Sequence, residues 1–136
     1  MGNDYSICVG ATGFGGGIWH SPDTGETWTR IRDPFPLGSQ VRGLAVYPDD
    51  PNRILAGADN GIYRSEDKGA TWEKLWSPME GFPIWSIAID PVDTQKILLE
   101  SIRRPFFAPG TVAIAGPSSR FRWPRNAISV PRWSPS

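Results

Sequence analysis

The chain has 136 residues, enough for one small domain, and its 14 basic and 14 acidic side chains give a formal net charge of zero. No run approaches the ~18 consecutive apolar residues of a membrane-spanning helix, and the single cysteine excludes an intrachain disulfide. The N-terminus also lacks the regions of a secretory signal. The sequence therefore favours a cytoplasmic location and no membrane partner, without identifying the compartment further.

The first predicted strand is Tyr5 to Val9, and a glycine-rich loop follows over residues 10–17. The loop lacks the spacing of a phosphate-binding motif. Gly13 and Gly15 would need another glycine at the position of Ile18, and no Gly-Lys-Ser/Thr follows. We therefore expect an inter-strand loop here, and no cofactor.

The next predicted hairpin contains the motif Ser-x-Asp-x-Gly-x-Thr-Trp at residues 21–28, which we call the first box. The same motif recurs at residues 65–72, the second box, 44 residues later and without a gap. A fixed period of this length indicates a repeat architecture. The shared positions are Ser21, Asp23, Gly25, Thr27 and Trp28 in the first box and Ser65, Asp67, Gly69, Thr71 and Trp72 in the second.

The motif has a structural interpretation from its residue types alone. Serine and aspartate hydrogen-bond to nearby backbone amides and close a turn, while glycine tolerates a positive φ there. Threonine and tryptophan then begin the outgoing strand. A residue that recurs in every repeat does not define a single site, so Asp23 and Asp67 are expected to be structural. The sequence predicts no catalytic residue and no metal ligand.

Between the boxes the chain forms one further predicted unit. Val41–Tyr47 and Arg53–Gly57 read as strands, and Asn60-Gly61 is a strong hairpin signal before the second box. These segments and the box hairpin give four strands in one period. Ile84 begins a copy of the Val41 strand, so a third unit starts there.

The motif resembles the Asp-box, or BNR, repeat of sialidase-like and sortilin-like β-propellers, over about residues 5–99. The resemblance implies an all-β fold, a partial propeller of about two four-stranded blades in residues 1–99. In this context His20 is expected to be a blade-surface residue and not a catalytic base. Cys8 is expected to be a small buried hydrophobe and not a nucleophile.

Residues 100–136 differ in composition and are predicted to form an irregular, basic, Pro/Arg/Ser-rich tail. Residues 1–99 carry 8 basic against 13 acidic side chains, whereas the tail carries 6 arginines against the single acid Glu100. One interpretation is a basic-aromatic RNA-binding arm. Its residues would be Arg103, Arg104, Arg120, Phe121, Arg122, Trp123 and Arg125.

The interpretation that we favour for the tail is a frameshift at about residue 100. From Pro105, codons read in a shifted frame permit the string FFRSGDRGDRWTKL, a third box. Its tryptophan would fall at residue 116, again 44 residues after Trp72. On this hypothesis the tail has no evolved role and the chain has no nucleic-acid partner. The nucleotide sequence decides between the two interpretations.

For function, the sequence predicts a binding or scaffold module with no self-contained catalytic site. Propellers bind through the loops between their strands, so carbohydrate or protein is the expected partner. The candidate contact residues are Phe14, Phe35, Met79, Phe82 and Trp85. The sequence leaves open whether each touches a ligand or packs between blades. Open blade edges are also expected to promote self-association.

The alternative is a fragment of a sialidase-like glycoside hydrolase. That chemistry needs a positioned acid and a nucleophile or base. The available acids are Glu66, Glu80 and Asp90, but no spacing singles out a pair, and the Arg-Ile-Pro signature that the resemblance implies before the first box is absent. About two blades do not assemble a site that converges from several. We therefore expect no catalysis by this chain alone, and glycosidase activity only from a longer parent.

Overall fold

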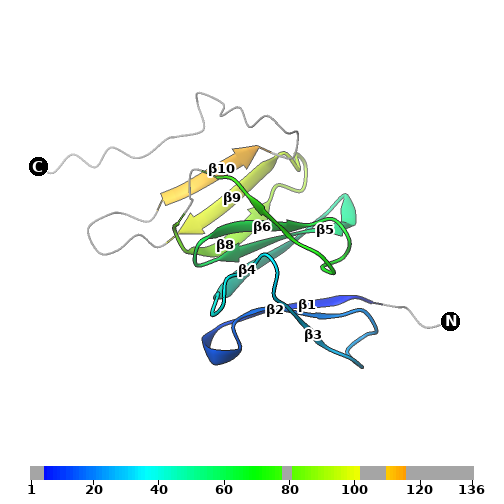
Figure 1. Cartoon of the computed structure of the whole chain (residues 1–136). Helices are drawn as coiled ribbons and strands as arrows, with labels where there is room; N and C mark the ends of the chain where they lie inside the picture. The colour runs from blue at the N-terminus through cyan, green and yellow to red at the C-terminus, as the bar shows by residue number, and fades with distance from the viewer. Residues whose placement is uncertain (1–4, 78–80, 102–109, 116–136) are drawn as a thin grey trace, which may run out of the picture.

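The computed structural model describes residues 5–77, 81–101 and 110–115, and these form three antiparallel sheets (Figure 1). The expected all-β fold is confirmed, with one short 3-10 turn, η1 (Gly13–Gly15), among the described residues. Sheet 1 has the order β1-β2-β3. Its strands are β1 (Ile7–Ala11), β2 (Gly17–Ser21) and β3 (Thr29–Ile31).

Sheet 2 is a complete four-stranded unit of the kind that the repeat predicts. Its order, β4-β5-β6-β7, follows the chain, so each strand pairs with the next through a hairpin. Two register shifts interrupt the pairing of β4 with β5. The strands are β4 (Val41–Tyr47), β5 (Asp50–Ala58), β6 (Gly61–Ser65) and β7 (Glu73–Leu75).

Sheet 3 begins at Ile84 and extends into the segment for which the sequence predicts an irregular tail. It contains β8 (Ile84–Ile89), β9 (Lys96–Ser101) and β10 (Gly110–Ala115), in the order β10-β9-β8. Strand β10 pairs with β9 as β6 pairs with β5, because the free edge of β9 offers unpaired backbone groups. The arginines proposed for an RNA-binding arm lie outside the described residues.

The sheets stack face to face, with sheet 2 between the other two (Figure 1). Side chains alternate along β5, so its two faces serve two cores. Ile54, Ala56 and Ala58 belong to the core against sheet 1, whereas Leu55 belongs to the core against sheet 3. The first core also contains Ile18, Phe35, Val41, Tyr63 and Trp72, and the second Tyr47, Ile62, Ile84, Ile97 and Leu99.

The approach of sheet 3 to sheet 2 depends on a glycine in β5. A Cβ added at Gly57 would lie 2.6 Å from Ile84 Cγ2 and 2.8 Å from Ile84 Cβ. These distances are far below van der Waals contact, and Ile84 is itself buried. Gly57 therefore allows β8 to lie directly against β5.

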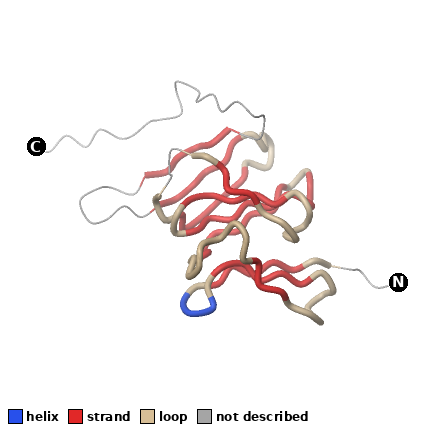
Figure 2. The backbone as a smooth tube through the Cα atoms, in the orientation of Figure 1, coloured by secondary structure: helices blue, strands red, loops and turns tan. Residues whose placement is uncertain are grey.

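Antiparallel pairing places the connections at two opposite ends of the strands. One end, the box end, carries both boxes and the turns that join β4 to β5 and β8 to β9. The other, the loop end, carries the connections β1–β2, β3–β4, β5–β6 and β7–β8. The η1 turn, blue in Figure 2, marks the loop end. A site at the box end is thus separated from a site at the loop end by the length of the strands.

The two box tryptophans provide a matched test of this packing. Trp72 is 7% exposed and Trp28 is 43% exposed, although both indoles donate to the glycine carbonyl of their own box. We expect Trp72→Ala to lower the free energy of unfolding by about 3–5 kcal/mol, because it leaves a cavity between the sheets. Trp28→Ala should cost less than about 1.5 kcal/mol. Urea unfolding of both variants measures the difference, and equal losses would contradict this packing.

Candidate functional site

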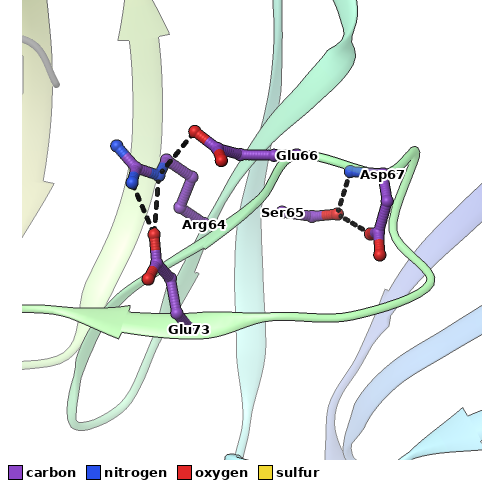
Figure 3. A network of polar contacts seen from close by, with 5 residues as sticks. All are labelled: Arg64, Ser65, Glu66, Asp67 and Glu73. Atoms are coloured by element: carbon purple, nitrogen blue, oxygen red, sulfur yellow. Dashed lines mark hydrogen bonds and ion pairs between the residues drawn. The ribbon is translucent and has the colours of Figure 1, made fainter.

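Each box is a turn closed by its own serine and aspartate. In the second box, Ser65 Oγ donates to Asp67 Oδ1 at 2.8 Å (Figure 3). It also accepts the Gly69 amide at 2.8 Å. The Asp67 carboxylate then accepts the Thr71 amide at 2.8 Å and the Thr71 hydroxyl at 2.5 Å. The Trp72 indole completes the turn with a bond of 2.9 Å to the Gly69 carbonyl.

The first box repeats these bonds with almost the same lengths. Ser21 Oγ donates to Asp23 Oδ1 and accepts the Gly25 amide, each at 2.8 Å. The Thr27 amide donates to Asp23 at 2.8 Å, and the Trp28 indole to Gly25 at 3.0 Å. All ten residues singled out in the sequence therefore lie in two separate turns at the box end. The structure does not bring the two aspartates into one site.

The hydrogen bonds in the boxes hold both aspartates in the ionised form. Bonds from the side chain and amide of Thr27 lower the pKa of Asp23. At Asp67, partial burial raises the pKa, but the bonds from Thr71 and Ser65 outweigh it, so the pKa again lies below its usual value. A carboxyl group with a lowered pKa is unprotonated at neutral pH and is a poor general acid.

The second box docks on sheet 1 through the backbone of Lys68. Its carbonyl accepts the Ser6 hydroxyl at 2.9 Å and the Cys8 thiol at 3.5 Å. Ser6 Oγ also lies 2.8 Å from His20 Nε2. Because the single Ser6 proton is donated to Lys68, His20 Nε2 is the donor in this second bond.

This docking gives His20 and Cys8 positions that differ from those expected. His20 is 8% exposed between sheets 1 and 2 and not on a blade surface, because the second box covers it. Cys8 is only half-buried. Burial, and then the Asp67 carboxylate, raises the pKa of the Cys8 thiol to about 11. Cys8 is thus a protonated packing residue at neutral pH and a poor nucleophile.

The remaining acids named from the sequence also have structural partners where they are described. Glu66 and Glu73 both pair with Arg64, whose Nη2 lies 2.5 Å from Glu73 (Figure 3). Asp90 accepts the Asp93 and Val92 amides, and these bonds lower its pKa. Glu80 lies outside the described residues. In residues 5–77 and 81–101, no group of three His, Cys, Asp or Glu side chains is placed to hold a metal ion.

The loop end is held together by hydrogen bonds between connections. Gln40 accepts the Gly13 amide through its side chain at 2.8 Å and the Asp59 amide through its carbonyl at 3.0 Å. The Gly81 amide donates to the Asn60 carbonyl at 3.4 Å. These contacts cross from one sheet to the next, so the connections of all three sheets form one surface.

This surface exposes large apolar side chains. Phe14 and Trp85, both expected as contact residues, are fully and about half exposed, respectively. Leu37 and Trp76 are also exposed, at 97% and 68%. Sequence reasoning missed both, although Leu37 lies in the β3–β4 connection and Trp76 in the β7–β8 connection. We call these four residues the apolar loop set.

Two of the expected contact residues instead serve the cores. Phe35 is 6% exposed, and its ring lies 4.2 Å from that of Tyr63. Phe82 is half-buried against the second core. Both are large enough to fill the space between sheets, which the sequence had left open as an alternative. Met79 lies outside the described residues.

A pocket of about 240 Å³ opens beside the apolar loop set. Arg30 Nη2 donates to the Gly16 carbonyl across it at 2.5 Å. The neighbouring Arg42 guanidinium lies 4.7 Å from the centre of the Trp85 ring. The pocket is lined by Gly16, Gly17, Arg30, Ile31, Arg32, Phe35, Pro36 and Leu37, a set without a carboxylate.

Comparison with known proteins supports the fold. Of the solved structures, the GH74 xyloglucanase from Xanthomonas campestris matches with a TM-score of 0.55 and 22% identity, over 74% of this chain. The expected partial β-propeller is thereby confirmed. This chain spans only 16% of that xyloglucanase chain. No protein-family model and no curated protein matches.

No helix in the described part of the chain is long and apolar enough to cross a membrane.

The change in the free energy of unfolding at acid pH tests the role of Asp67. The pKa of Asp67 in the folded protein lies below the ordinary value of 3.8. The ionised carboxylate therefore stabilises the fold fully above pH 3.8, and this stabilisation is lost as the pH falls through the pKa of the folded protein. Asp67→Asn should lower the free energy of unfolding by about 1 kcal/mol at pH 7 and leave it nearly unchanged near pH 2.

Urea unfolding from pH 2 to pH 7 measures this convergence. The control is Glu26→Gln, which removes an exposed carboxylate from a position that is Ala70 in the second box. The control should follow the wild type throughout. A constant gap between Asp67→Asn and wild type across the pH range would refute the role of the ionised carboxylate.

Proposed function

We propose that this chain is a non-catalytic binding module, and that it binds polysaccharide through the loop end of its blades. The observation that carries the proposal is the apolar loop set, Phe14, Leu37, Trp76 and Trp85, exposed at one end of the strands. Isolated surface residues need no explanation, but four large apolar side chains at the same end of three sheets, three of them on connections and Trp85 at the start of β8, support an interaction surface.

The chemistry of this surface suits sugar rings. The faces of Phe14, Trp76 and Trp85 are apolar platforms against which the C–H face of a sugar stacks. Arg42, placed over Trp85, restricts the orientation of that indole. The guanidinium groups of Arg30 and Arg32 in the pocket supply donors for sugar hydroxyls.

Xyloglucan is the polysaccharide to test first. One matching solved structure is a xyloglucanase, and a glucan backbone presents repeated flat sugar faces to a row of aromatic side chains. The likeness itself supports only the shared fold. The ligand is therefore inferred from the apolar loop set together with that enzyme's substrate.

The alternative is that the chain is part of a sialidase-like or other Asp-box glycoside hydrolase. The glycosidase neighbour favours it. A hydrolase site needs two carboxyl groups flanking the scissile bond, ~5–10 Å apart. Asp23, Asp67 and Asp90 lie at the box end, away from the apolar loop set, and are engaged in turns. On this alternative, the partner carboxylates come from other blades of a longer protein.

Binding without hydrolysis is the expected behaviour of this chain. Calorimetric titration with xyloglucan oligosaccharides should show binding, with no reducing ends released on long incubation. Trp85→Ala should weaken binding about three- to tenfold, the effect of losing one aromatic platform worth about 1 kcal/mol. Phe14→Ala should act in the same direction.

The matched control is Val92→Ala, at an apolar side chain that is 93% exposed in the β8–β9 turn of the box end. It should bind as the wild type does. No binding by the wild type, or equal weakening by the control, would refute the proposal. Release of reducing ends would favour the hydrolase alternative.

A further inference from the structure

Sheet 1 is a partial copy of sheet 2, and the strand registers give the equivalent positions. Ile7 pairs with Ser21 in sheet 1 as Ile54 pairs with Ser65 in sheet 2. In the same way β3 pairs with β2 as β7 pairs with β6. Strands β1, β2 and β3 therefore correspond to β5, β6 and β7. Each residue of sheet 1 can be compared with its counterpart one blade further along.

The comparison reveals a face of sheet 1 that is built for packing but has no sheet against it among the described residues. In sheet 2 the equivalent face is covered by sheet 1, and Ala56 and Tyr63 there are both 0% exposed. Their counterparts are Val9, which is 43% exposed, and Trp19, which is half-buried. Trp28 is exposed for the same reason, as the counterpart of buried Trp72.

Within residues 5–77, 81–101 and 110–115, sheet 3 has the complementary free face. Ile97 and Leu99 of β9 are buried against sheet 2, so Leu98 between them points to the opposite side. Leu98 is 45% exposed, whereas its counterpart in sheet 2, Leu55, is 1% exposed because sheet 3 covers it. Leu98 thus stands where a following sheet would pack.

We propose that the free face of sheet 1, around Val9, Trp19 and Trp28, binds the free face of sheet 3, around Leu98, of a second copy of this chain. The packing of sheet 1 on sheet 2 and of sheet 2 on sheet 3 continues across the boundary between molecules. The contact is head-to-tail, because the two surfaces differ, and each molecule keeps one surface of each kind.

This association uses faces and not the blade edges that the sequence suggests. The faces carry the apolar side chains, and their internal counterparts form the two cores of the molecule. The loop end remains open, because stacking proceeds across the sheets and not along the strands. A chain of stacked copies would therefore carry several copies of the apolar loop set on one side.

Two variants and their mixture test the proposal, with mass measured by sedimentation or light scattering. Wild type should associate in a concentration-dependent way. Val9→Lys and Leu98→Lys should each lower the association constant by at least tenfold, because each places a charge in the contact. An equimolar mixture should form a dimer, since the intact sheet 3 of the first variant meets the intact sheet 1 of the second.

Val92→Lys is the control, because it adds the same charge to a turn at the box end, and it should associate as wild type does. A dimer in the mixture also shows that both variants are folded. A monomeric wild type, or a mixture that stays monomeric, overturns the proposal. If Leu98→Lys alone associated as strongly as wild type does, sheet 1 faces would pair with each other, and this result would also overturn the proposal.

Discussion

The structure depends on one contact, the docking of the second box on sheet 1. The box closes its own turn, since its serine, aspartate and threonine hydrogen-bond within eight residues. The Lys68 carbonyl then accepts bonds from Ser6 and Cys8 of sheet 1. A Cβ at Gly69 would lie 2.0 Å from Cys8 Sγ, so the glycine that closes the turn also permits the docking. A local motif thereby fixes the distance between two blades.

The difference between the box end and the loop end explains why binding is proposed at one end of the blades only. The box end uses the carboxylates of Asp23 and Asp67 to close turns, and these carboxylates are ionised and hydrogen-bonded. The Lys68 carbonyl then joins the second box to sheet 1. The loop end joins its connections through Gln40 and the Asn60 carbonyl and uses no carboxylate in these bonds, and its connections vary in length and sequence. It is therefore free to expose Phe14, Leu37, Trp76 and Trp85. The box turns and the proposed binding surface are therefore separated by the length of a strand.

The sequence predicts what is encoded locally. The boxes, the hairpins and the start of sheet 3 at Ile84 follow from short-range hydrogen bonding and alternation, and the all-β propeller fold is confirmed on that basis. Burial between blades is set by residues far apart in the chain, and no local pattern shows it. Hence the sequence leaves open whether Phe35 contacts a ligand or packs between blades, and the structure places its ring against Tyr63. The sequence predicts a surface position for His20, which instead lies under the second box. Strand β10 forms by pairing with the free edge of β9, and no local sequence pattern predicts this pairing.

Amide hydrogen exchange tests the central claim most directly, because the two boxes share the hydrogen bonds of their serine, aspartate and tryptophan, whereas only the second box is docked on another described sheet. It is measured on Val9→Lys, so that no second copy covers the first box. The account predicts that the Gly69 and Thr71 amides exchange at least about tenfold more slowly than those of Gly25 and Thr27, since opening the second box also breaks the contact between blades. Equal exchange in the two boxes would show that the turns are stable by themselves and that docking does not hold the blades together.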